Sequence, residues 1–174
     1  MKLKCVFLDR DGVINEDRGY ISKISQFKMY PGVGKAIKFL NDKKYLVIII
    51  TNQSGIGRGL ISIKELNNIH KYLKKKIKLN KAHINDIYYC PFHPIFGIGK
   101  YKKKSHYRKP GDGMIKKAIK EWNIDPTQSF MIGDKVTDKI ASNKAKIKFF
   151  YKKEKNLNFQ IKRIIKKKLR FIKN

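Results

Sequence analysis

The sequence feature that most constrains the fold is a short apolar run that ends in two closely spaced carboxylates. Residues 5–8, Cys-Val-Phe-Leu, are continuously apolar, which is typical of a buried strand. Asp9 and Asp11 follow this run directly, with Gly12 behind them. Two carboxylates at the end of a strand can turn toward the crevice in which open α/β sheets bind ligands. One of them could attack phosphorus while the other moves a proton, provided that a cation screens their repulsion.

Strand-like apolar runs alternate with amphipathic helical patterns along the rest of the chain. The predicted strands cover residues 5–8, 45–50, 84–90, 129–132 and 147–151, and the predicted helices cover residues 33–44, 62–79, 113–122, 135–144 and 157–172. Residues 12–31, 51–59 and 91–112 are predicted to be loops. Ser62, with Glu65 three residues later, is the predicted N-cap of the second helix. The alternation implies right-handed crossovers and predicts an α/β fold with a doubly wound parallel, Rossmann-like sheet.

The length of the chain indicates one domain. At 174 residues it is long enough to bury a full core, and no internal repeat or interdomain linker is apparent. We therefore predict a single domain over residues 1–174, in which residues 152–174 form a basic C-terminal helix.

The strong positive charge of the chain raises the question of an anionic partner. The formal net charge is +29, but only six of the 42 basic residues are Arg, and the Lys residues are spread along the whole chain. Abundant Lys, Ile and Asn are also what an AT-rich genome produces without selection for binding. We interpret the charge as a solvated, Lys-rich surface rather than a dedicated nucleic-acid site.

Membrane and disulfide signals are missing from the sequence. No apolar run approaches the roughly 20 residues that span a bilayer, and the N-terminus leads into a strand without a signal peptide. Two cysteines, Cys5 and Cys90, do not make a disulfide framework. These features predict a cytoplasmic protein with no membrane partner.

Polar residues that end the predicted strands are expected to converge on one site. They are Asp9 with Asp11, Thr51, Arg108 with Lys109 late in the third loop, and residues 133–138, which include Asp134 and Asp138. The ends of parallel strands point the same way, so these groups can meet at one edge of the sheet. Each signal is weak alone, since Asp134 also suits the N-cap of the following helix. Their combination in this order indicates phosphoryl transfer.

Each of these groups has a predicted role in that chemistry. Asp9 would attack phosphorus in line and form an aspartyl-phosphate. Asp11 would protonate the leaving oxygen and then take a proton from the hydrolytic water. Thr51 and Lys109 would hold the equatorial phosphoryl oxygens. Mg²⁺ would be held by Asp9, Asp134 and the backbone carbonyl of Asp11.

Six motifs along the chain resemble those of one known family. They are Asp9-Arg-Asp-Gly-Val-Ile-Asn15, Asp17-Arg-Gly-Tyr20, Thr51-Asn-Gln-Ser-Gly-Ile-Gly-Arg58, Tyr89-Cys-Pro91, Tyr107-Arg-Lys-Pro110 and Met131-Ile-Gly-Asp-Lys135. By these motifs the chain resembles the haloacid dehalogenase superfamily, in the branch of D-glycero-D-manno-heptose 1,7-bisphosphate 7-phosphatases and histidinol-phosphatases. The resemblance covers about residues 3–151. It implies a magnesium-dependent bacterial phosphatase, without a separate cap domain, that acts on a small phosphate ester.

The resemblance also implies which residues bind the substrate. Arg108 would recognise it, Lys109 would steady the phosphoryl group, and Lys135 would bind substrate. The other implied contacts come from two loops: Asp17, Arg18, Gly19 and Tyr20 in the first, and Thr51, Asn52, Gln53 and Ser54 in the second.

The third loop departs from the pattern of the resembling family. Many members carry Cys-x-His and Cys-x-Cys there, as four ligands of a structural zinc. Here Cys90 remains, whereas Phe92, Ser105 and Tyr107 occupy the other three positions. We therefore expect no zinc. The alternative is a makeshift site that joins His93 and His106 to Cys90; otherwise prolines and aromatic side chains would hold the loop, namely Tyr89, Phe92, Phe96, Tyr101 and Tyr107.

The leading hypothesis is hydrolysis of the 7-phosphate of a heptose bisphosphate, which would supply heptose for lipopolysaccharide. Histidinol phosphate is the rival substrate within the branch. A hypothesis of another class is a nucleic-acid-binding module, suggested by the charge and by the basic tail. Apolar residues recur at helical spacing in that tail, so we expect its apolar face to pack on the sheet: Ile161, Ile164, Ile165, Leu169 and Ile172. Fold analogy predicts a monomer.

Overall fold

The computed structural model describes residues 2–171, with side chains as far as residue 167, and contains one parallel sheet. Its strands are β1 (Cys5–Leu8), β2 (Leu46–Asn52), β3 (Asp86–Cys90), β4 (Phe130–Gly133) and β5 (Lys148–Tyr151). They lie in the order β3-β2-β1-β4-β5, and every neighbouring pair is parallel. The strand order reverses between β1 and β4, the place where doubly wound sheets open a crevice for ligands. The predicted doubly wound parallel sheet is confirmed.

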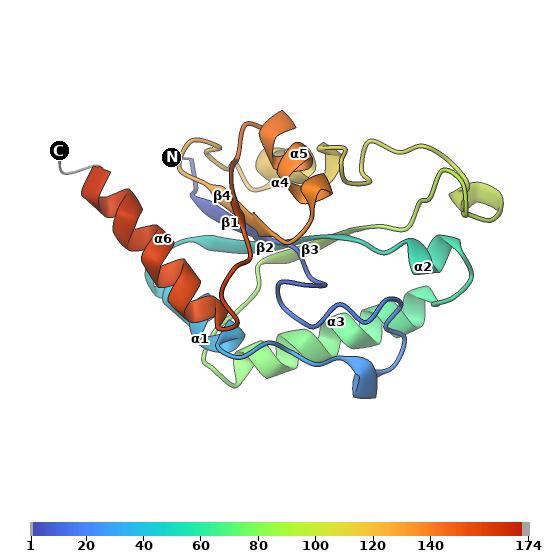
Figure 1. Ribbon diagram of the computed structural model, residues 1–174, viewed down its shortest axis with the longest axis horizontal. Coiled ribbons are helices and arrows are strands. Elements are labelled where there is room, and N and C mark those ends of the chain that lie inside the picture. The colour runs from blue at the N-terminus through green and yellow to red at the C-terminus, as the bar shows by residue number, and fades with distance from the viewer. Residues whose placement is uncertain (1, 172–174) are drawn as a thin grey trace.

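Helices cover both faces of this sheet, as Figure 1 shows. The six helices of the described residues are α1 (Val33–Asp42), α2 (Ser54–Gly57), α3 (Ile63–Lys78), α4 (Gly113–Glu121), α5 (Val136–Lys144) and α6 (Leu157–Phe171), with short 3₁₀ turns η1 (Ile24–Gln26) and η2 (Gly99–Tyr101). Helices α1, α3 and α6 contribute to the core on one face, and α4 and α5 to the core on the other. The predicted capping box of α3 is present, because Ser62 Oγ accepts from the backbone N–H of Glu65.

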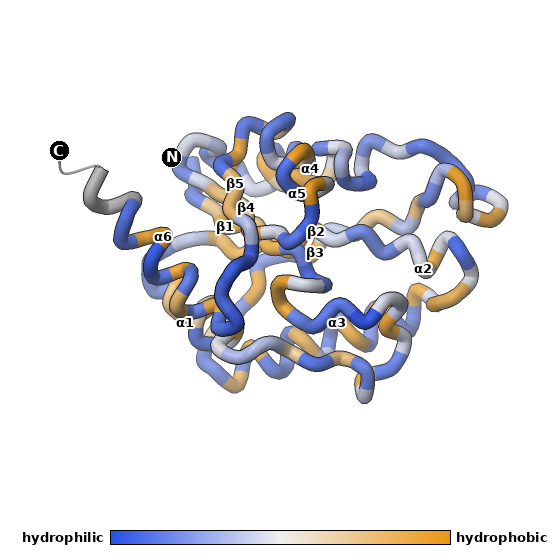
Figure 2. Tube along the Cα trace, viewed as in Figure 1, coloured by the Kyte–Doolittle hydropathy of each residue, from blue (hydrophilic) through white to orange (hydrophobic). Residues whose placement is uncertain are grey.

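The alternation of side chains along the strands explains the two cores. Val6 and Leu8 of β1 join the core under α1, α3 and α6, whereas Cys5 and Phe7 join the core under α4 and α5. All four side chains are fully buried. Figure 2 shows hydrophobic residues along these central strands.

One loop prediction is wrong in part. Residues 51–59 were expected to be a loop, but Thr51 and Asn52 extend β2 and residues 54–57 form the short helix α2. The strand continues because Thr51 pairs with Tyr89 and Asn52 with Cys90 on β3. These partners are distant in the sequence, so local composition does not reveal the pairing.

The C-terminal helix belongs to the core as far as its side chains are described. Leu157, Ile161, Ile164 and Ile165 of α6 are buried in the cluster that contains α1 and one face of the sheet. This confirms that the apolar face of the tail packs against the body of the protein. Leu169 and Ile172, which were predicted to continue this face, lie outside the residues whose side chains are described. Across residues 2–171, a membrane-spanning helix is not found, since none combines the necessary length with apolar character.

Replacing a buried residue of α6 tests whether this helix is part of the folding unit. Ile161 is fully buried, so Ile161→Ala removes packed methyl groups and is expected to lower the free energy of unfolding by about 2–5 kcal/mol. Urea denaturation followed by circular dichroism measures this change. Lys166→Ala, on the exposed side of the same helix, is the control and should change stability by less than about 0.5 kcal/mol. Equal, small effects of both substitutions would contradict the packing of α6.

Candidate active site

A cavity of about 410 Å³ opens at the carboxyl ends of the central strands and gathers most of the predicted residues. It is lined by Asp9, Asp11, Thr51 and Lys109, by Asp17, Gly19, Tyr20, Asn52, Gln53, Ser54, Arg108 and Lys135, and additionally by Thr137 and Asp138. Arg18 does not line it: its guanidinium pairs with Glu16 at 2.8 Å, and its side chain is 48% exposed. The expected convergence of strand ends is therefore seen for every predicted catalytic residue.

Asp9, Lys109 and Asp138 form a buried ion cluster at the floor of the cavity. Lys109 Nζ lies 2.9 Å from Asp9 Oδ1 and 2.6 Å from Asp138 Oδ1, and it also donates to the carbonyl oxygen of Ile50 at 2.9 Å. The ammonium group of Lys109 thus lies between two carboxylates and one carbonyl oxygen. Asp9 Oδ1 also accepts from the backbone N–H of Arg10, whereas no hydrogen bond reaches Oδ2 from any described residue. Oδ2 is thus the oxygen of Asp9 that is available to attack.

Burial governs the protonation of this cluster. Loss of solvent raises the pKa of Asp9 to about 7; the charge of Lys109 opposes the rise, and that of Asp138 adds to it. Burial alone would lower the pKa of Lys109, but the charges of Asp9 and Asp138 outweigh it and raise that pKa. Lys109 is therefore a fixed cation, and Asp9 needs further positive charge to be fully ionised at neutral pH.

Two reciprocal hydrogen bonds with the side-chain amide of Asn52 hold Lys109, which belongs to the long segment of residues 91–112, at the cavity. Asn52 Nδ2 donates to the carbonyl oxygen of Lys109 at 3.0 Å, and the N–H of Lys109 donates to Asn52 Oδ1 at 3.0 Å. Next to Asn52, the Gln53 amide donates to Thr51 Oγ1 at 2.9 Å. The end of β2 therefore positions both Lys109 and Thr51.

Asp11 lies beside this cluster and is held by several donors. The guanidinium of Arg10 contacts both of its carboxylate oxygens, with Nη2 2.9 Å from Oδ2 and 3.0 Å from Oδ1. Asn15 Nδ2 donates to Oδ1 at 2.9 Å, and Gln53 Nε2 donates to Oδ2 at 2.8 Å. Asp11 is thus firmly oriented at the wall of the cavity.

The mouth of the cavity carries charged groups from three segments. Lys135 Nζ pairs with Asp17 Oδ2 at 2.7 Å; partial burial opposes the ionisation of Asp17, but this ion pair outweighs it and lowers its pKa. Arg58 donates to the hydroxyl of Tyr20, and Arg108 donates to the carbonyl oxygen of Phe92 at 3.3 Å. The first two contacts connect the first loop with the N-cap of α5 and with the C-cap of α2, and the third lies within the segment of residues 91–112.

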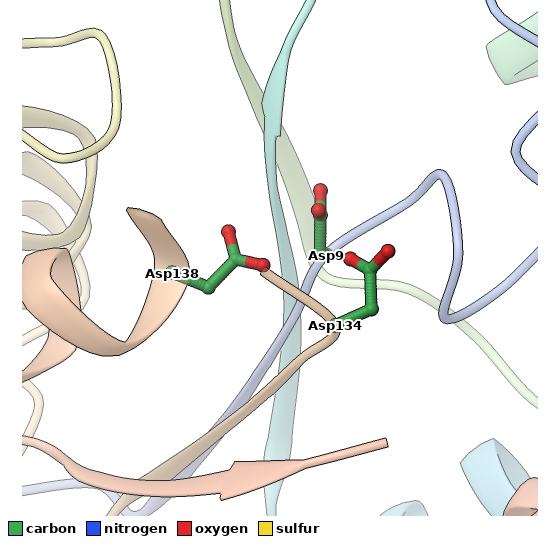
Figure 3. Close-up of side chains that lie close together, drawn as sticks. All are labelled: Asp9, Asp134 and Asp138. Carbon is green, nitrogen blue, oxygen red and sulfur yellow. The ribbon is translucent and has the colours of Figure 1, made fainter. Parts of the chain in front are cut away.

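Three neighbouring carboxylates, including that of Asp9, could hold a cation. Oxygens of Asp9, Asp134 and Asp138 lie within 4.8 Å of one another, and Figure 3 shows the carboxylates of Asp9 and Asp134 next to each other with Asp138 approaching from α5. Asp134 Oδ1 is buried without a hydrogen-bond partner, which fits an oxygen that awaits a cation. Asp138 Oδ2 accepts from the N–H of Lys135, and its Oδ1 has no hydrogen-bond partner but lies 2.6 Å from Lys109 Nζ in an ion pair. Asp9 and Asp134 each keep an oxygen that no described donor or ammonium group contacts, which suits a hard cation.

Asp134 is not a helix cap, contrary to the alternative considered from the sequence. The N-cap of α5 is Lys135, and Asp138 is the residue whose side chain closes the capping box. Asp134 instead follows β4 and approaches Gly12, where a Cβ atom would lie 2.2 Å from Asp134 Oδ2. Burial raises the pKa of Asp134 although the neighbouring charge of Lys135 opposes this. Asp134 does not line the cavity itself, but it lies beside Asp9, so its position suits cation binding rather than a helix cap.

Comparisons with known proteins agree with this geometry. The model of the family described as polynucleotide kinase 3 phosphatase matches residues 6–167. A D-glycero-beta-D-manno-heptose-1,7-bisphosphate 7-phosphatase from Haemophilus ducreyi is 46% identical over 149 residues, which are 85% of this chain and 81% of the relative. The chain belongs to the heptose-bisphosphate phosphatase branch of the haloacid dehalogenase superfamily.

Other members of this branch also match over most of their length. A D-glycero-alpha-D-manno-heptose-1,7-bisphosphate 7-phosphatase from Burkholderia mallei is 40% identical over 145 residues, 83% of this chain and 77% of the relative. The crystal structure of a D,D-heptose 1,7-bisphosphate phosphatase from B. bronchiseptica, complexed with magnesium and phosphate, aligns with a TM-score of 0.81. The alignment covers 95% of this chain and 99% of that chain at 23% identity, and so shows a shared haloacid dehalogenase fold.

The residues at the zinc-ligand positions of the branch, and the two histidines near them, make contacts that involve no metal. Cys90 is buried in the core, and the ring of Phe92 lies 6.0 Å from that of Tyr101. His93 Nδ1 accepts from the N–H groups of residues 95 and 96, and His106 lies against Tyr107 with 4.1 Å between ring centres. In the part of the chain whose side chains are described, Cys90 and these histidines do not form a group that could hold a metal. The expectation of no zinc stays a prediction.

Two residues of this site, Arg10 and His70, were not identified from the sequence. Asp138 was expected to converge on the site but was given no role of its own; the structure places it on the first turn of α5, in contact with Lys109. Arg10 lies between the two aspartates, and strand-like alternation would predict that its side chain points away from theirs, whereas its guanidinium contacts Asp11. His70, which contacts Arg10, is 60 positions away on α3 and carries no local signal.

A substitution at Gly12 tests whether the position of Asp134 determines cation binding. The new Cβ of Gly12→Ala would meet Asp134 Oδ2 and push this carboxylate away from Asp9, so the dissociation constant for Mg²⁺ is expected to rise at least about 10-fold. Isothermal titration calorimetry measures the constant. Gly99→Ala is the matched control, because Gly99 also has a positive φ but no atom lies within 4 Å of its new Cβ.

Both variants should lose about 1–2 kcal/mol of stability through backbone strain, but only Gly12→Ala should lose Mg²⁺ affinity. Unchanged affinity in Gly12→Ala would contradict the assignment of Asp134 as a ligand.

Proposed function

We propose that this protein is a magnesium-dependent phosphoric monoester hydrolase that removes the 7-phosphate of D-glycero-D-manno-heptose 1,7-bisphosphate. The observation that carries the proposal is Asp9, buried at the floor of an open polar cavity with Oδ2 unpartnered and Oδ1 fixed by Lys109. A carboxylate in this setting suits nucleophilic attack better than a structural role, because a buried structural carboxylate normally has both oxygens bonded. The names of the relatives support the heptose substrate over histidinol phosphate.

The first step forms a covalent phosphoenzyme. Asp9 Oδ2 attacks phosphorus, and the bond between phosphorus and the leaving sugar oxygen breaks. The electron pair of that bond remains on the sugar oxygen, which takes a proton from Asp11. Thr51 and Lys109 hold the equatorial oxygens, where charge is spread in the transition state. The products of this step are the sugar with a free hydroxyl group at carbon 7 and an aspartyl-phosphate.

The second step releases phosphate. Water attacks the phosphorus of the aspartyl-phosphate and transfers a proton to Asp11. The bond between phosphorus and the Asp9 oxygen breaks, and its electron pair restores the carboxylate. Asp11 is protonated at the end of this step, ready for the next substrate. The sum of the two steps is hydrolysis of one phosphate ester.

Asp9, Asp134 and the backbone carbonyl of Asp11 are the proposed holders of Mg²⁺. When bound, the cation would neutralise the charge between carboxylate and phosphate and favour the ionised form of Asp9. The raised pKa of Asp9 and the unpartnered oxygen of Asp134 support this assignment. Asp138 then acts by holding Lys109 rather than by binding the metal.

The cavity wall is proposed to recognise the rest of the substrate. Arg108 and Lys135 offer positive charge, and hydroxyl, amide and carboxylate groups line the remaining wall and could bind the hydroxyl groups of a sugar: Asp17, Tyr20, Asn52, Gln53 and Ser54. Arg18 stays a predicted contact of the first loop. The place of the enzyme in lipopolysaccharide precursor synthesis, a cytoplasmic location and a monomeric state also stay predictions.

Parallel assays test the proposed substrate. Phosphate release with Mg²⁺ should be fastest from heptose 1,7-bisphosphate, offered as both anomers, and much slower from histidinol phosphate and from a 3′-phosphorylated oligonucleotide. Asp9→Asn should lower kcat by at least about 10³-fold, because the covalent route is removed. Asp42→Asn, which changes an exposed carboxylate of α1, should leave kcat unchanged.

Preference for histidinol phosphate would overturn the sugar assignment but keep the mechanism. Preference for the oligonucleotide would instead agree with the name of the matching family model and make the net charge of +29 a functional property.

A further inference from the structure

Arg10 has an environment that is unusual for arginine. Among the described residues it has the largest fully buried side chain, although it carries a permanent charge. Burying an ion costs several kcal/mol unless partners compensate for the lost water. Its guanidinium contacts one carboxylate, that of Asp11, and one further side chain, His70.

The contacts of Arg10 divide the two oxygens of Asp11 into different roles. Oδ1 accepts from Arg10 Nε at 3.2 Å, from Arg10 Nη2 at 3.0 Å and from Asn15 Nδ2 at 2.9 Å, so it has no further capacity. Oδ2 accepts from Arg10 Nη2 at 2.9 Å and from Gln53 Nε2 at 2.8 Å. Gln53 lines the cavity. When the hydrogen bond from Gln53 Nε2 to Oδ2 breaks, this oxygen becomes available to a bound phosphate ester.

His70 fixes the other end of Arg10. Its Nε2 lies 3.3 Å from Arg10 Nη1, and its ring packs edge-on against Tyr89 with 6.2 Å between ring centres. Burial, together with the charges of Arg10 and Lys74, lowers the pKa of His70 to about 3. The ring is therefore neutral, and its Nε2 can accept a hydrogen bond from the guanidinium. His70 belongs to α3 and does not line the cavity.

We propose that Arg10, held by His70, is a positioning residue that anchors Asp11 through Oδ1 and leaves Oδ2 as the oxygen that exchanges the proton. This inference rests on the proposed role of Asp11 as acid and base. Asp11 has two rotatable side-chain bonds, and a carboxylate that is free to rotate reaches the leaving oxygen less often. Loss of the anchor should therefore slow proton transfer while the attack by Asp9 persists.

The test separates the attack from the proton transfer. With p-nitrophenyl phosphate the leaving group needs no proton, so the initial burst of p-nitrophenolate reports phosphorylation of Asp9. With glycerol 3-phosphate the leaving alkoxide needs a proton, so single-turnover cleavage reports Asp11 as well. Arg10→Met should reduce the cleavage rate of the alkyl ester about 100-fold and the burst rate of the aryl ester less than about 10-fold. In an Asp11→Asn background, Arg10→Met should have no further effect on the alkyl ester.

Variants of His70 keep the test informative if Arg10→Met does not fold. His70→Leu removes the acceptor and should slow cleavage of the alkyl ester about 10-fold, whereas His70→Gln, which keeps an acceptor, should restore most of the rate. His83→Leu replaces an exposed histidine and is the control without effect. Equal losses on both esters in Arg10→Met or His70→Leu, or additive losses with Asp11→Asn, would overturn the positioning role.

The same series separates this inference from the proposed mechanism. A selective loss on the alkyl ester in Asp11→Asn, without such a loss in Arg10→Met and His70→Leu, overturns the inference alone. Equal losses on both esters in Asp11→Asn overturn the role of Asp11 itself, and the inference with it.

Discussion

The buried contact of Lys109 with Asp9 and Asp138 is the interaction on which the site depends. It joins the end of β1, the long segment of residues 91–112 and the first turn of α5. A buried cation between two carboxylates is stable only if all three groups stay in place, because removal of one leaves an uncompensated buried charge. Through this cluster the carboxyl ends of the strands acquire one common geometry. The fold supplies the crevice, and the cluster determines where the reacting carboxylate lies within it.

The distribution of negative charge around this cluster explains why a cation is expected there. Lys109 contacts one oxygen of Asp9 and one of Asp138, but Asp134 contributes a buried oxygen that no described donor reaches. A phosphate ester would bring further negative charge to the same place. Without a divalent cation, burial keeps Asp9 partly protonated near neutral pH, as its pKa of about 7 indicates. Cation binding and the ionisation of Asp9 are therefore coupled, because both depend on the net charge of these groups.

The sequence predicted the parts of the site that follow from strand topology. Asp9, Asp11 and Thr51 follow apolar runs, and parallel strands bring such positions together. It did not predict the helix of residues 54–57, because contacts such as the hydrogen bond from Gln53 N to the carbonyl of Cys90 determine that backbone. The partners of Arg10 were missed for a similar reason. His70 approaches it only after α3 packs beneath the sheet, and helical periodicity marks His70 as a core position without naming its partner.

Direct detection of the phosphoenzyme tests the central claim, nucleophilic attack by Asp9. Asp11→Asn should slow hydrolysis of the intermediate, so this variant can be mixed with Mg²⁺ and p-nitrophenyl phosphate, whose leaving group needs no proton. The mixture is then quenched in acid, digested and examined by mass spectrometry. The account predicts one phosphoryl group on the peptide that contains Asp9, absent when Asp9→Asn is added to the variant. Cleavage of substrate without a phosphorylated peptide, or a phosphoryl group on another residue such as Asp134, would contradict it.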